Sequence, residues 1–78
     1  MINYITLNDI APEEKAKIKS INISGSMKRR LLDIGLIENT VIECVGKSPM
    51  GDPKAFLIRG AVIAIRSDDS SKIIVEKL

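Results

Sequence analysis

The sequence predicts a mainly β protein, a small and strongly bent barrel of about five strands with one short helix inserted at about residues 26–34. Three features support this prediction. Short stretches with apolar residues at alternate positions recur, turns rich in Gly, Pro and Asn separate them, and one stretch has helical spacing instead. The chain has 78 residues, the size of one domain, so residues 1–78 are treated as one unit. Because only 3% of the residues are aromatic, Ile, Leu and Val must fill the thin core.

The N-terminal part predicts a helical turn and then a bent strand. Thr6–Asp9 matches a capping box, with the hydroxyl residue first and the carboxylate three residues later. Residues 15–23 alternate as a strand, but the apolar phase changes between Ile18 and Ile21. A change of phase requires an extra residue, so we expect a bulge near residues 19–20.

The inserted helix is expected to begin at Ser26, whose hydroxyl can accept a bond from a backbone N–H group. Gly35 follows the helix and can adopt a left-handed conformation at no steric cost. Leu36 then packs back onto Leu31, the contact that commonly accompanies such an ending. The apolar stripe of the helix comprises Met27, Leu31 and Ile34. So short a helix is unstable alone in water and must pack on the strands.

The rest of the chain predicts four more strands and their turns. A turn at Asn39 precedes a strand at residues 41–45, and the Gly- and Pro-rich residues 46–53 form a loop with Met50 at its tip. A tight hairpin turn at Arg59-Gly60 joins the next two strands. The polar residues 67–71 form a turn before the last strand. The last three strands are expected at residues 54–59, 61–66 and 72–76.

The two hairpin strands carry more apolar residues than one core requires. The inward face comprises Phe56, Ile58, Ile63 and Ile65, and the opposite face comprises Ala55, Leu57, Val62 and Ala64. A single thin sheet exposes that opposite face, so either another layer of this chain or another molecule covers it.

We therefore expect a partner-binding surface with Leu57 and Val62 at its centre, Met50 beside them, and Arg29 and Arg30 at a basic rim. The alternative is that the helix or the termini of the chain itself cover Leu57 and Val62. A second copy of the chain is another occupant, which makes a homodimer an open alternative.

The sequence lacks the residues that most enzymes and metal sites use. It has no His and one Cys, and it contains neither a phosphate-binding nor a dinucleotide-binding glycine motif. Cys44 lies in the middle of a strand, where a buried apolar role is expected. Asp68 and Asp69 are adjacent, so their side chains diverge. We expect no catalysis, no cofactor and no metal site.

Charge and hydropathy predict a cytosolic protein. The net charge is +2, and the basic residues 28–30 are interpreted as a solubilising helix face. The N-terminal residues 1–5 lack the pattern of a secretory signal, and no apolar run approaches the ~20 residues that span a bilayer.

Asp33 lies in the last helical turn, at the negative end of the helix dipole. A carboxylate is unfavourable there, which leads to the hypothesis that Asp33 pairs with Arg59 or Arg66. A solvated Asp33 without a partner is the alternative.

Several segments, taken in their order along the chain, resemble the ferrous iron transport protein A (FeoA) family. The segments are Arg30-Leu31-Leu32-Asp33-Ile34-Gly35-Leu36, Gly51-Asp52-Pro53, Ile58-Arg59-Gly60 and Ile63-Ala64-Ile65-Arg66. The chain departs from the family pattern at Glu13 and Asn39, where a glycine is usual, and at Ser70-Ser71, where an acidic-alanine segment is usual.

The resemblance implies an SH3-like barrel and a cytosolic accessory protein that binds FeoB, a membrane ferrous iron transporter with a GTP-binding domain. Related barrels in metal-dependent repressors make a regulatory role on such a repressor the first alternative. A nucleic-acid-binding barrel is the second, but stacking platforms are scarce, because Tyr4 and Phe56 are the only aromatic residues.

Overall fold

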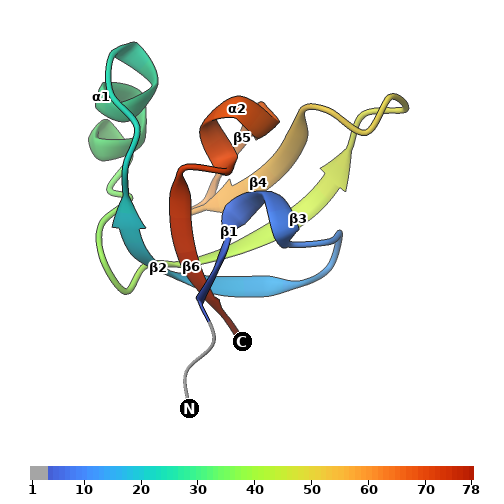
Figure 1. Cartoon of the computed structure of the whole chain (residues 1–78), viewed down its shortest axis with the longest axis horizontal. Coiled ribbons are helices and arrows are strands. Elements are labelled where there is room, and N and C mark those ends of the chain that lie inside the picture. The colour runs from blue at the N-terminus through green and yellow to red at the C-terminus, as the bar shows by residue number, and fades with distance from the viewer. Residues whose placement is uncertain (1–3) are drawn as a thin grey trace.

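The structure is a computed structural model that describes residues 4–78. One antiparallel sheet, with strand order β1-β6-β2-β3-β4-β5, curls into a small barrel (Figure 1). The strands are β1 (Tyr4–Thr6), β2 (Lys15–Ile21), β3 (Val41–Lys47), β4 (Lys54–Ile58), β5 (Ala61–Ile65) and β6 (Ile73–Lys77). The helical elements are the 3₁₀ turn η1 (Leu7–Asp9) and the helices α1 (Ser26–Asp33) and α2 (Ser67–Ser70). The predicted mainly β barrel with one short inserted helix is confirmed.

The described chain has one strand more than the expected five. The extra strand, β1, pairs with β6 from Tyr4↔Glu76 to Thr6↔Ile74. Three residues are too few to show an alternating pattern, so nothing in the sequence separates this strand from the helical turn after it. The prediction about a secretory signal concerns residues 1–5, of which residues 1–3 lie outside the described residues.

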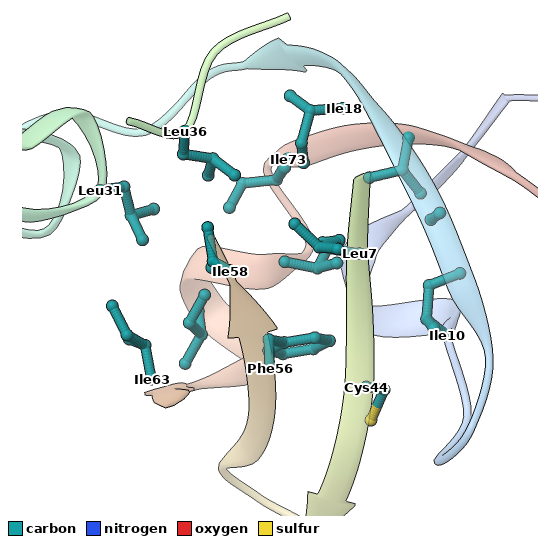
Figure 2. Packing of buried hydrophobic residues seen from close by; sticks show 14 of the residues in the cluster. Leu7, Ile10, Ile18, Leu31, Leu36, Cys44, Phe56, Ile58, Ile63 and Ile73 are labelled. Atoms are coloured by element: carbon teal, nitrogen blue, oxygen red, sulfur yellow. The ribbon is translucent and has the colours of Figure 1, made fainter. Parts of the chain in front are cut away.

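One side of the sheet surrounds a single apolar core, with Phe56 as its largest side chain (Figure 2). The alternation predicted for the hairpin strands is confirmed, because its four inward residues are buried. The buried cluster comprises Leu7, Ile10, Ala16, Ile18, Ile23, Leu31, Leu36, Ile42, Cys44, Phe56, Ile58, Ile63, Ile65, Ile73 and Val75. These side chains come from every strand except β1, and from η1 and α1 or the segments beside them, so one core holds the whole fold together.

Two irregularities let the short strands bend around this core. The pairing of β2 with β6 shifts register between Ile18 and Ser20, which confirms the predicted bulge. The pairing of β3 with β4 shifts between Cys44 and Gly46, which was not predicted. Gly46 was assigned to the loop, and this was wrong, because the bulge allows it to stay in β3 opposite Ala55.

The end of α1 is fixed by a Schellman motif at Gly35, as predicted. The Leu36 N–H donates to the Leu31 carbonyl at 2.9 Å, the Gly35 N–H donates to the Leu32 carbonyl at 3.0 Å, and Gly35 has φ +92°. Both Leu31 and Leu36 are buried, so this ending anchors the helix on the core. The assignment of Ser26 as the cap was wrong. Gly25 caps the helix with φ +81°, a backbone turn that disfavours a side chain, and Ser26 is the first helical residue.

At the N-terminus, the predicted capping box is present. The Asp9 carboxylate accepts a hydrogen bond from both the N–H and the hydroxyl of Thr6, each at 3.0 Å.

The two positions where the FeoA pattern has glycine both adopt a left-handed backbone. Glu13 has φ +76° and Asn39 has φ +74°. Asn tolerates this conformation, and its side-chain oxygen also accepts a hydrogen bond from the Lys19 ammonium at 3.1 Å. Glu13 has an exposed side chain with no such compensation, so its turn is strained.

We predict that Glu13→Gly stabilises the protein. The left-handed penalty of about 1–2 kcal/mol disappears, while glycine costs about 0.5–1 kcal/mol in chain entropy, so the melting temperature should rise by a few degrees. Asn39→Gly is the matched control and should gain less. A melting temperature that falls in Glu13→Gly would contradict this account of the turn.

Candidate functional site

The outer face of β3, β4 and β5 becomes apolar toward β5. The strand registers place Lys15, Glu43, Leu57 and Val62 in one row across β2, β3, β4 and β5. The two charged residues are neighbours at one end of this row, and the two apolar residues are neighbours at the other. The predicted pair Leu57 and Val62 is therefore a direct cross-strand contact.

The described part of the chain leaves this pair open to solvent. Val62 is 64% exposed and Leu57 is half-buried. Neither α1 nor the described part of a terminus covers both residues, so this alternative was wrong for residues 4–78. Beside this pair, a second row on the same face consists of three small residues, Gly46, Ala55 and Ala64. We call the surface formed by Ala55, Leu57, Val62 and Ala64 the outer patch.

The three other predicted partner-binding residues lie at the two ends of the molecule. Arg29 and Arg30 are exposed on α1, and Met50 is 92% exposed in the loop between β3 and β4 (Figure 1). Leu57 and Val62 lie between these ends, because β4 runs from the Met50 loop to the Arg59–Gly60 turn.

The exposed side of α1 contains a shallow hollow of about 300 Å³, lined by Gly25, Lys28, Arg29, Leu32 and Asp33. Leu32 is 47% exposed there, beside two basic residues and one acidic residue. The hypothesis that Asp33 pairs with Arg59 or Arg66 was wrong. The ion pairs among residues 4–78 are Lys19–Glu76 and Glu14–Lys77. Asp33 faces the hollow, and Arg66 follows the end of β5 that lies away from the hairpin turn.

The Met50 loop is held by contacts that the sequence did not reveal. The Asp52 carboxylate accepts hydrogen bonds from the N–H of Ser67 at 2.9 Å and from its hydroxyl at 3.1 Å. The Ser48 hydroxyl donates to the Asp52 carbonyl at 2.8 Å, and Gly51 turns the chain with φ +87°. The Gly51-Asp52-Pro53 motif thus anchors the loop to α2 and presents Met50.

Two basic side chains make contacts that hold separate segments of the fold together. The Lys54 ammonium donates to the Asn8 carbonyl at 2.6 Å and to the Ile10 carbonyl at 3.1 Å, which ties β4 to the end of η1. The Arg59 side chain lies directly over Gly35, so the hairpin turn packs against the end of α1. Neither contact was predicted, since both join residues far apart in the sequence.

Charge interactions among residues 4–78 are few. The Glu14 carboxylate hydrogen-bonds to the Lys77 ammonium and accepts the Ala11 N–H at 2.8 Å, which together lower the pKa of Glu14. Across residues 4–78, no group of three or more His, Cys, Asp or Glu side chains converges to hold a metal ion. No helix in this part of the chain is long and apolar enough to cross a membrane.

Fold and site together define a class: a small SH3-like barrel domain with an exposed apolar patch on one sheet face. The FeoA domain model matches residues 5–77. The chain therefore belongs to the FeoA family, which is associated with ferrous iron transport. The FeoA domain is a non-catalytic accessory or regulatory domain, so this chain is not an enzyme.

Solved structures agree with this assignment. The FeoA-like protein of Clostridium acetobutylicum is 35% identical over 100% of this chain and 91% of that one, with a TM-score of 0.84. Iron(II) transport protein A of Clostridium thermocellum is 30% identical over 95% of this chain and 46% of that one, with a TM-score of 0.84. The zinc complex of Stenotrophomonas maltophilia FeoA, a prokaryotic SH3 domain protein, is 21% identical over 91% of this chain and 88% of that one, with a TM-score of 0.77.

The same fold occurs outside the family. A manganese-dependent transcriptional repressor matches with a TM-score of 0.82 at 15% identity, over 100% of this chain and 44% of that one, which shows the fold alone. No curated protein matches the sequence.

We predict that Gly35→Ala destabilises the protein by about 1–2 kcal/mol, because alanine is strained at the left-handed φ of this position. A Cβ atom would also lie 2.8 Å from Arg59 Cδ, but that flexible side chain can move. Chemical denaturation should therefore show a smaller loss for Gly35→Asn, and little recovery when Arg59→Ala is added to Gly35→Ala. Wild-type stability in Gly35→Ala would contradict the role assigned to the helix ending.

Proposed function

We propose that this chain is a cytosolic accessory protein of ferrous iron uptake that binds the cytosolic part of the transporter FeoB through protein–protein contacts. The observation that carries the proposal is the Leu57–Val62 pair, an apolar cross-strand contact in which residues 4–78 leave Val62 exposed and Leu57 half-buried. Family membership supports the link to ferrous iron transport. The S. maltophilia relative is described as a candidate activating factor of bacterial ferrous iron transport, which agrees with an accessory role.

The proposed interface has the outer patch at its centre. Burial of apolar surface contributes roughly 25 cal/mol per Å², so a partner that covers the exposed Val62 and Met50 side chains gains binding free energy from both. Arg29 and Arg30 form its basic end on α1, and Met50 forms an apolar tip at the other end. A partner that contacts all five residues has to extend along β4 and β5 from one end of the molecule to the other.

The two alternative functions have less support. The likeness to the manganese-dependent repressor concerns the fold, and no residue of the candidate site ties this chain to such a protein. A nucleic-acid-binding barrel requires exposed aromatic residues for base stacking, and Phe56 is buried.

We predict that Val62→Glu leaves the protein folded but weakens its binding to the cytosolic part of FeoB by roughly tenfold or more. The exposed position tolerates the charge, whereas an apolar interface has to desolvate it. Titration calorimetry with the two purified proteins measures this loss.

Leu78→Glu is the matched control, because Leu78 is 60% exposed but follows β6, at the other side of the sheet. It should bind like wild type. Equal binding by wild type and Val62→Glu, both folded, would rule out the outer patch as the interface.

A further inference from the structure

Met50 is the most exposed large apolar side chain among residues 4–78, at 92%. It lies in a hydrogen-bonded turn, in which the Gly51 N–H donates to the Ser48 carbonyl at 2.8 Å and Pro49 takes the second position. The Ser48 N–H also donates to the Pro53 carbonyl at 3.1 Å, which closes the base of the loop. Met50 is not among the side chains that pack against the core, so its thioether is open to small molecules in the solvent.

The other two sulfur-containing residues of the described chain are shielded. Cys44 lies in the core, fully buried, and its thiol donates to the Gly46 carbonyl at 3.5 Å (Figure 2). Met27 is half-buried and packs against the core. Because the oxidation of sulfur follows its exposure, an oxidant dissolved in water reacts first with Met50 among residues 4–78.

Hydrogen peroxide oxidises an exposed methionine to its sulfoxide. A lone pair of the sulfur attacks one peroxide oxygen, and the O–O bond breaks. That oxygen stays on the sulfur, while its proton passes to the departing hydroxide, which leaves as water. The thioether loses two electrons and the peroxide gains two, so no further reactant is required.

The sulfoxide changes the chemistry of the tip that Met50 contributes to the proposed interface. Methionine is enriched at protein interfaces, whereas its sulfoxide is polar and carries an oxygen that water solvates. A partner that covers the oxidised side chain has to remove this water. Peroxide is the relevant oxidant for a ferrous iron transport family, because Fe²⁺ reduces it to a hydroxyl radical and a hydroxide ion.

We propose that Met50 is a site of peroxide modification, and that its oxidation to the sulfoxide weakens the binding of the partner. The inference rests on the proposed function, because it requires the Met50 tip to contact the cytosolic part of FeoB. The modification is reversible, since methionine sulfoxide reductases restore the thioether. In that reaction two thiols become a disulfide, and the oxygen leaves as water.

Peptide mapping tests the modification itself. The purified chain is treated with hydrogen peroxide, and mass spectrometry of its proteolytic peptides locates each added oxygen atom. The Met50 peptide should gain one oxygen several-fold faster than the Met27 peptide, and the Cys44 peptide should stay unmodified over the same time. Equal rates at Met50 and Met27, or faster oxidation of Cys44, would overturn the assignment.

Titration calorimetry tests the consequence, with only this chain oxidised and the peroxide removed before FeoB is added. The oxidised wild type should bind the cytosolic part of FeoB about tenfold more weakly than the reduced wild type, and treatment with methionine sulfoxide reductase should restore the affinity. Met50→Leu removes the sulfur, so its affinity, whatever its starting value, should not change with peroxide. Met27→Leu is the matched control and should respond to peroxide as the wild type does.

Equal affinities of the oxidised and reduced wild type would overturn the proposed effect on binding and leave the proposed function standing. A loss of affinity that peroxide also causes in Met50→Leu would overturn it as well, by assigning the effect to another residue. No binding of FeoB by the untreated wild type would refute the proposed function itself, and the peptide map would still decide whether Met50 is the modified residue.

Discussion

The whole fold depends on closing one short sheet around a core that contains a single aromatic side chain, Phe56 (Figure 2). Aliphatic residues must supply most of the remaining volume, so the buried positions of the long strands are apolar. Bulges in β2 and β3 bend the strands enough to close this small space. The Schellman ending at Gly35 then brings Leu31 and Leu36 into the same core, which fixes the position of α1.

Local patterns revealed most of this architecture in advance. Alternation along the hairpin identified the inward face because successive strand residues point to opposite sides, and the change of phase near Lys19 revealed the first bulge. The bulge at Gly46 was not predicted, because a glycine that is followed by a loop is typical of the end of a strand. The helix cap was misplaced by one residue, since Ser26 has the better capping chemistry and Gly25 the required backbone freedom.

Features of the site that depend on long-range contacts could not be predicted from the sequence. The pairing of Leu57 with Val62 followed from the hairpin, but the open edge beside Val62 becomes visible only when the strand order is known. The supporting contacts of Lys54, Asp52 and Arg59 join residues far apart in the chain. The predicted ion pair of Asp33 with Arg59 or Arg66 was wrong for the same reason, because it also depended on a contact between distant residues. The structure thus presents a barrel that Lys54, Asp52 and Arg59 support, with Val62 of the outer patch exposed among residues 4–78.

We propose that this FeoA domain acts by docking a partner on the outer patch. The most direct measurement is a comparison of amide chemical shifts of the isotope-labelled chain, alone and with the cytosolic part of FeoB. The account predicts that the largest changes occur at Leu57, Val62 and Ala64, with β1 and β6 unaffected. Changes confined to β1, β2 and β6, with the hairpin unperturbed, would contradict it.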